Sequence, residues 1–213
     1  RAVVSQQGDQ GLTNRVDSYR KDSIDFRADF QKSSNESIMF LAGTNQGKFG
    51  VGGPDSIADP IRNEKNSTSF AHLKFKNLVD DSQEWSVSAS WTHDGGRDAY
   101  LIPLLSGGEL EILKNRKANR YSLEYQHYNS LSNSLRASWG GEYHRDQVQS
   151  MELFATDAHQ KNAAWRVYYN QEWKPLPSWT FNAGGLLEQD LFSPQQFAPR
   201  FSVNWKPSPD HVL

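Results

Sequence analysis

The chain has 213 residues, which is long enough for one all-β domain or for a large piece of one. Its formal net charge of −2 argues against a protein that binds nucleic acid through a basic surface. The absence of cysteine excludes disulfides and thiolate metal sites. Only 36% of the residues are hydrophobic, yet 12% are aromatic. Because disordered chains are poor in aromatic residues, this composition indicates strands that alternate between an apolar and a polar face.

No run of 18 apolar residues occurs, so the sequence predicts no transmembrane helix. The chain opens with Arg1 and carries neither an initiator methionine nor a signal peptide. We therefore expect a mature or excised segment of a longer gene product.

Alternation of apolar and polar residues with a period of two recurs along the chain and predicts strands with one apolar face. In residues 84–93, for example, the apolar side chains of Trp85, Val87, Ala89 and Trp91 are separated by serine and threonine. The predicted strands are Ser23–Gln31, Ile38–Phe49, Thr68–Leu78, Glu84–His93, Arg120–Tyr128, Leu135–Arg145, Asn162–Trp173, Trp179–Leu187 and Arg200–Lys206.

The two ends of the chain have weaker patterns. Residues 1–21 are polar, although Val3 and Val4 are able to end a preceding strand. A tight turn at Pro207–Asp210 would lead into a tenth strand that begins at His211.

The connections between the predicted strands alternate between short and long. Short turns follow the first, third, fifth, seventh and ninth strands, and the turn at Lys174–Ser178 holds two prolines. The longest connection, Asp94–Asn119, is expected to be a loop that contains a short helix or an additional hairpin. The other long connections are Gly50–Asn66, Asp146–Lys161 and Glu188–Phe197.

This alternation predicts an all-β, antiparallel up-and-down meander with the short turns at one end of the sheet and the long loops at the other. Greek-key sandwiches do not produce this asymmetry, whereas outer-membrane barrels do. Tilted strands of about 9–11 residues also match the hydrocarbon thickness of a bilayer. We therefore predict part of a transmembrane β-barrel with about nine to ten strands.

Tryptophan is concentrated near the predicted short turns. Trp85, Trp173, Trp179 and Trp205 lie within two residues of such a turn, as expected for an aromatic girdle at one membrane interface. The alternative is that tryptophan is simply a good strand residue. The opposite face is rich in charged and amide side chains, which predicts a wide barrel that holds water or a plug.

Three segments carry a family resemblance. Residues Phe192–Leu213 place a Pro-Arg-apolar strand before a Lys-Pro-x-x-Asp turn and the start of another strand, with the chain ending three residues later. Together with Leu41–Gly50 and Asp59–Asn63, this resembles the barrel of TonB-dependent outer-membrane receptors. The resemblance implies a receptor in the bacterial outer membrane that transports a scarce large solute of the siderophore-iron or cobalamin class. It also implies contact with membrane lipid and with a TonB-type energy-coupling protein, through a plug that is missing here.

The sequence departs from a whole receptor because it shows neither a plug domain nor a terminal strand that ends in an aromatic residue. We therefore expect residues 1–213 to be a single partial β-barrel domain. The predicted solute contacts are Arg97, Tyr100 and Arg116, in what would be an extracellular loop.

No nucleotide-binding, hydrolase or metalloprotease motif occurs, and we expect no enzyme activity, cofactor or resident metal. Asp94 and Asp98 flank glycines and could touch Ca²⁺, but a solvated loop is the favoured interpretation. Two further function classes stay open. One is a self-contained porin-type or adhesin-type small barrel, and the other is a soluble carbohydrate-binding β-sandwich.

Overall fold

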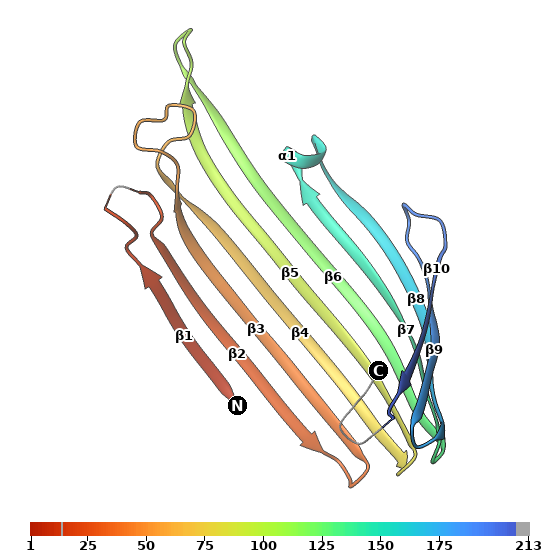
Figure 1. The fold of residues 1–213 in the computed structure, drawn as a ribbon. Helices are drawn as coiled ribbons and strands as arrows, with labels where there is room; N and C mark the ends of the chain where they lie inside the picture. The colour runs from red at the N-terminus through yellow and green to blue at the C-terminus, as the bar shows by residue number, and fades with distance from the viewer. Residues whose placement is uncertain (14, 208–213) are drawn as a thin grey trace.

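The computed structural model describes residues 1–13 and 15–207, which form one antiparallel sheet (Figure 1). Ten strands lie in the sheet in the order in which they occur along the chain. This confirms the predicted all-β meander. The strands are β1 (Ala2–Asp9), β2 (Tyr19–Gln31), β3 (Glu36–Val51), β4 (Arg62–Asp80), β5 (Gln83–Pro103), β6 (Glu109–Ser132), β7 (Leu135–Ser150), β8 (Thr156–Leu176), β9 (Trp179–Gln189) and β10 (Gln196–Trp205).

Short and long connections alternate as predicted and lie at opposite ends of the sheet (Figure 1). The turns that join β2 to β3, β4 to β5, β6 to β7 and β8 to β9 have two to four residues. The β7–β8 connection at the other end contains the one helix of the described residues, α1 (Met151–Phe154), which is a single turn. In Figure 1 the short turns lie at the bottom and the longer connections at the top.

The predicted strands correspond to β2–β10, but most are longer than predicted at the end with the long connections. The prediction of a mainly irregular loop at Asp94–Asn119 was wrong, and its alternative of an additional hairpin is confirmed. Strands β5 and β6 stay paired from Arg97↔Asn115 to Pro103↔Glu109, and only residues 104–108 form the turn. Both faces of these extensions carry a mixture of polar and apolar residues, so no single apolar face is visible in the sequence although backbone pairing continues.

The first strand, β1, was predicted only as a possible remnant at Val3 and Val4. It pairs with β2 from Ala2↔Phe26 to Asp9↔Tyr19. The predicted strand that begins at His211 lies outside the described residues, as does most of the predicted turn before it.

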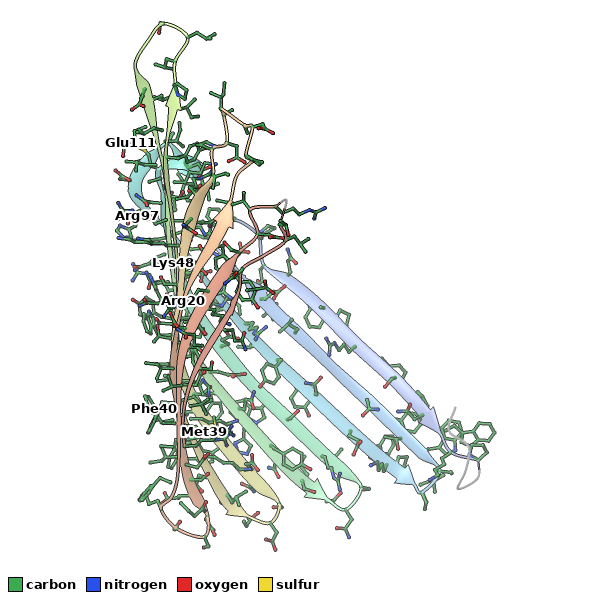
Figure 2. The ribbon with its side chains drawn as sticks, turned by 90° about the vertical axis from the view of Figure 1, so that its left-hand side faces the viewer. Arg20, Met39, Phe40, Lys48, Arg97 and Glu111 are labelled. Carbon is green, nitrogen blue, oxygen red and sulfur yellow. The ribbon has the colours of Figure 1, made fainter. Side chains whose placement is uncertain are left out.

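The register across the sheet separates an apolar face from a polar one. Paired residues share a face, and the pairing Phe40↔Leu73↔Ala89↔Leu123↔Tyr143↔Trp165 crosses six strands. The sheet is strongly curved, and Figure 2 shows Phe40 on its convex side and Met39 on the other. The apolar face is therefore convex, and its side chains are exposed, for example 55% for Leu123. The concave face is polar.

Aromatic rings gather on the convex face near the short turns. The centroids of Trp179 and Trp205 lie 5.7 Å apart, and those of Trp173 and Phe181 lie 5.6 Å apart. A second group joins neighbouring strands through Phe75–Trp85, Trp85–Tyr125 and Tyr125–Trp139 contacts at 5.3, 6.4 and 5.2 Å. These contacts form a nearly continuous aromatic row from β4 to β10, at the position predicted for the girdle.

Within the described part of the chain, no helix is long and apolar enough to cross a membrane.

A glycine on the concave face of β7 allows two strands to pack closely. A Cβ atom at Gly140 would lie 2.4 Å from the carbonyl oxygen of Tyr125 and 2.5 Å from the hydroxyl of Tyr168. The ring of Tyr168 therefore covers Gly140, and the missing side chain is a packing requirement.

We predict that Gly140→Ala destabilises the sheet by about 1–3 kcal/mol, because the methyl group meets a backbone atom that cannot move aside alone. Ser138→Ala, two residues earlier on the same face, should change stability by less than about 0.5 kcal/mol. Denaturant unfolding in detergent, followed by tryptophan fluorescence, measures both. Equal midpoints for the two variants would contradict the packing argument.

Candidate functional site on the concave face

The concave face carries ion pairs between neighbouring strands β6, β7 and β8. Arg120 donates two hydrogen bonds to Asp146, at 2.6 and 2.9 Å. Glu142 pairs with Arg166, and Arg136 lies 3.8 Å from Glu172. Most of the cations are about half exposed, so each pair contributes at most about 1 kcal/mol to stability. The main consequence of these pairs is a hydrophilic wall.

One ion pair at the end with the long connections is buried. Arg62 at the start of β4 donates to both carboxylate oxygens of Asp98 on β5, at 2.6 and 2.7 Å. Their side chains are only 13% and 9% exposed. Both residues lie well beyond the apolar part of their strands, and the Arg62 guanidinium lowers the pKa of Asp98 below its ordinary value. Arg62 also donates to Asp59 in the β3–β4 connection, at 2.6 Å, and so ties that connection to the sheet.

Tyr100 lies beside this ion pair. The guanidinium carbon of Arg62 is 3.9 Å from the centre of the Tyr100 ring, which is a close cation–π contact. The ammonium group of Lys114 on β6 is 5.9 Å from the same centre and 3.5 Å from Glu152 in α1. The strands and α1 therefore hold an aromatic ring between two cations at the rim of the sheet. Such an arrangement suits a solute that carries negative charge or aromatic groups.

Arg116 lies on the same face, further along β6. Its guanidinium is 3.5 Å from Glu64 and 3.6 Å from Asp94, and it donates to Asn66 at 3.1 Å. The side chain is 51% exposed, so the longer contacts leave it free to reorient toward a solute.

The structure divides the three predicted contact residues between the two faces. Tyr100 and Arg116 lie on the concave face, whereas Arg97 lies on the convex face, where it pairs with Asn115 and Lys65. All three lie on paired strands and not in an irregular loop. The set therefore does not form one site, because an odd number of residues along a strand separates opposite faces.

The residues that surround Tyr100, namely Arg62, Asp98 and Lys114, were not predicted. Arg62 and Asp98 are 36 positions apart, and only the pairing of β4 with β5 brings them together. The one signal in the sequence was the spacing of Asp98 and Tyr100, which places them on the same face of a strand. Within the described residues, no group of three histidine or acidic side chains is arranged to hold a metal ion.

Comparisons with known proteins agree with this geometry at the level of the fold. No protein-family model and no curated protein matches the sequence. Among solved structures, the siderophore receptor PirA from Pseudomonas aeruginosa matches with a TM-score of 0.68 at 10% identity, over 89% of this chain and 31% of that one. The ferric enterobactin receptor PfeA from Pseudomonas aeruginosa matches with a TM-score of 0.71 at 7% identity, over 95% of this chain and 34% of that one. The ferric-catecholate import receptor Fiu from Escherichia coli matches with a TM-score of 0.66 at 8% identity, over 98% of this chain and 47% of that one.

The sheet therefore has the fold of part of a β-barrel wall. More particularly, the chain has the fold of a segment of the barrel wall of siderophore receptors, which confirms the predicted resemblance for the fold. It spans about a third of the length of the first structures that it matches.

We predict that Asp98→Asn destabilises the ends of β4 and β5 by about 3 kcal/mol, because breaking a buried ion pair leaves a charge with fewer partners. Asp29→Asn, which removes the exposed pair with Arg27, should leave amide protection close to that of the parent protein, because solvent screens an exposed pair. Hydrogen exchange of β4 and β5 amides measures the local effect. Unchanged protection in Asp98→Asn would rule out the anchoring role.

Proposed function

We propose that this chain is a barrel segment of a TonB-dependent receptor in the bacterial outer membrane, which imports a scarce large solute of the siderophore-iron or cobalamin class. The observation that carries the proposal is the continuous register, which gives a curved sheet one apolar convex face and one polar concave face. A membrane-spanning wall needs this distribution, with lipid on one side and a wet interior on the other.

The likeness to solved receptors supports the same function. The similar structures include a siderophore receptor, a ferric citrate transporter and a copper transporter, so the fold alone leaves the solute open. The polar concave face suits contact with a plug domain, through which a TonB-type protein would supply energy. In this proposal the chain acts in transport and has no catalytic role.

The solute contacts that we propose are Tyr100 and Arg116, at the rim of the concave face. Tyr100 offers a ring whose position is set by Arg62 and Lys114. Arg116 offers a guanidinium that is half exposed and suited to carboxylate or catecholate oxygens. Both residues lie toward the end with the long connections, which in this proposal is the end that a solute would meet first.

The solute contacts can be tested with the protein in detergent, titrated with ferric enterobactin, ferric citrate and cobalamin while tryptophan fluorescence is recorded. Tyr100→Ala and Arg116→Ala should each weaken binding of the solute that the protein recognises by roughly tenfold, which corresponds to loss of one charge-assisted or cation–π contact. Leu101→Ala, the neighbour of Tyr100 on the convex face, should bind normally. If all three variants bind like the parent protein, the proposed contacts are wrong.

A separate prediction tests whether the convex face lies against lipid. Leu123→Arg, in the middle of the convex face, should destabilise the protein in a bilayer by about 2–4 kcal/mol. Ser122→Arg, the next residue on the concave face, should cost much less because it points to water. Unfolding from lipid vesicles in denaturant measures both, and an equal cost for the two variants would refute a lipid-facing convex side.

A further inference from the structure

The convex face changes from apolar to basic toward the end with the long connections. Figure 2 shows Arg20, Lys48 and Arg97 on the side of the sheet that also carries Phe40. The register places Arg20, Lys48, Lys65 and Arg97 in one row across β2 to β5. Lys117 on β6 lies in the next row, opposite Gly95. Together these five side chains form what we call the basic row.

The basic row surrounds an open hollow of about 740 Å³. Gly95 leaves space at its floor, since a Cβ atom there would lie 2.9 Å from the Ser67 hydroxyl and 3.2 Å from the His93 ring. Amide and hydroxyl groups of Gln46, Ser67, Asn115 and Gln149 also line the hollow, together with the carboxylates of Asp22 and Asp157. The five cations of the basic row outnumber these two carboxylates, and cations beside neutral hydrogen-bond donors are the chemistry that binds phosphate oxygens.

Most of the basic row lacks an acidic partner. Arg20 pairs with Asp22 at 3.2 Å, but no carboxylate of the described residues lies within 4.0 Å of the charged groups of the other four. Like charges that lie directly opposite each other destabilise a sheet, and Lys48, Lys65 and Arg97 are neighbours in one row. An anion bound among these cations would offset their mutual repulsion. On the concave face, by contrast, most arginines have a carboxylate partner.

The position of the basic row identifies the kind of anion. On β2 only Asp22 separates the outward side chains of Ile24 and Arg20, and on β5 only His93 and Gly95 separate Trp91 from Arg97. The cations thus begin where the apolar surface ends, as expected next to the headgroups of a bilayer. Most side chains that line the hollow lie on the convex face, which faces away from a solute in transit through the barrel.

We propose that the basic row binds the phosphate groups of anionic lipid headgroups in the leaflet at the end with the long connections. The inference rests on the proposed function, because it requires the convex face to lie in a membrane. The bound lipid would act as a counter-ion that joins β2 to β6 across their outer surface, and it would raise the stability of these strands.

The test uses the protein in uncharged detergent, titrated with phosphatidylglycerol, with phosphatidylcholine and with inorganic phosphate. Native mass spectrometry counts the bound lipids, and thermal unfolding reports the stabilisation. The parent protein should prefer phosphatidylglycerol to phosphatidylcholine. Lys48→Gln/Lys65→Gln should weaken phosphatidylglycerol binding by at least roughly tenfold, since each basic residue near an anionic surface contributes about a fivefold factor.

The matched control is Lys21→Gln/Lys74→Gln, which removes the same charge from β2 and β4 on the concave face. It should bind phosphatidylglycerol like the parent protein. Equal losses in both double variants, or no loss in either, would overturn the inference, and so would saturation by inorganic phosphate alone. If the parent protein inserts into bilayers and yet shows no preference for anionic lipid, only this inference fails. If it does not insert at all, the proposed function fails with it.

Discussion

The structure depends on one constraint, which is the register that runs without interruption across the middle of all ten strands. Side chains alternate between faces every residue, so a slip of one position in any pair would move that strand's apolar residues to the polar side. The irregularities between paired strands occur near connections, as at Leu78/Asp80 and Ser130/Ser132, where the apolar face has ended. The middle of the sheet can therefore present one uniform face from β1 to β10.

The two faces contribute to stability in different ways. The convex face contributes little within the chain, because its side chains are exposed and meet mainly their neighbours along the surface. In the proposed membrane setting, lipid would cover its apolar residues and stabilise the protein. The concave face supplies many weak ion pairs, and the buried Arg62–Asp98 pair is the exception. Arg62 of this pair also donates to Asp59 in the β3–β4 connection and contacts the Tyr100 ring. The same cation therefore stabilises the structure and positions a candidate binding residue.

The separation of Arg97 from Tyr100 and Arg116 shows that the strand register decides which face each side chain occupies. Residues 97 and 100 are three apart on one strand, so they lie on opposite faces although they are close in sequence. One side chain then belongs to the polar rim and the other to the basic row. If residues 94–119 are treated as a loop, the opposite orientation of Arg97 and Tyr100 is not predicted, because side chains in an irregular loop do not alternate between two faces.

The sequence by itself determined the all-β class, the meander, the alternation of short and long connections and the apolar face. Each of these follows from local patterns, such as the alternation from Trp85 to Trp91 or the two prolines near Trp173 and Trp179. Only the tertiary structure decided where the strands end toward the long connections. Pairing there is maintained by backbone hydrogen bonds between stretches in which polar and apolar residues occur on both faces, so their sequences do not show one apolar face. The structure also decided which charges meet, since Arg62 and Asp98, or Lys48 and Lys65, become neighbours only through pairing between strands.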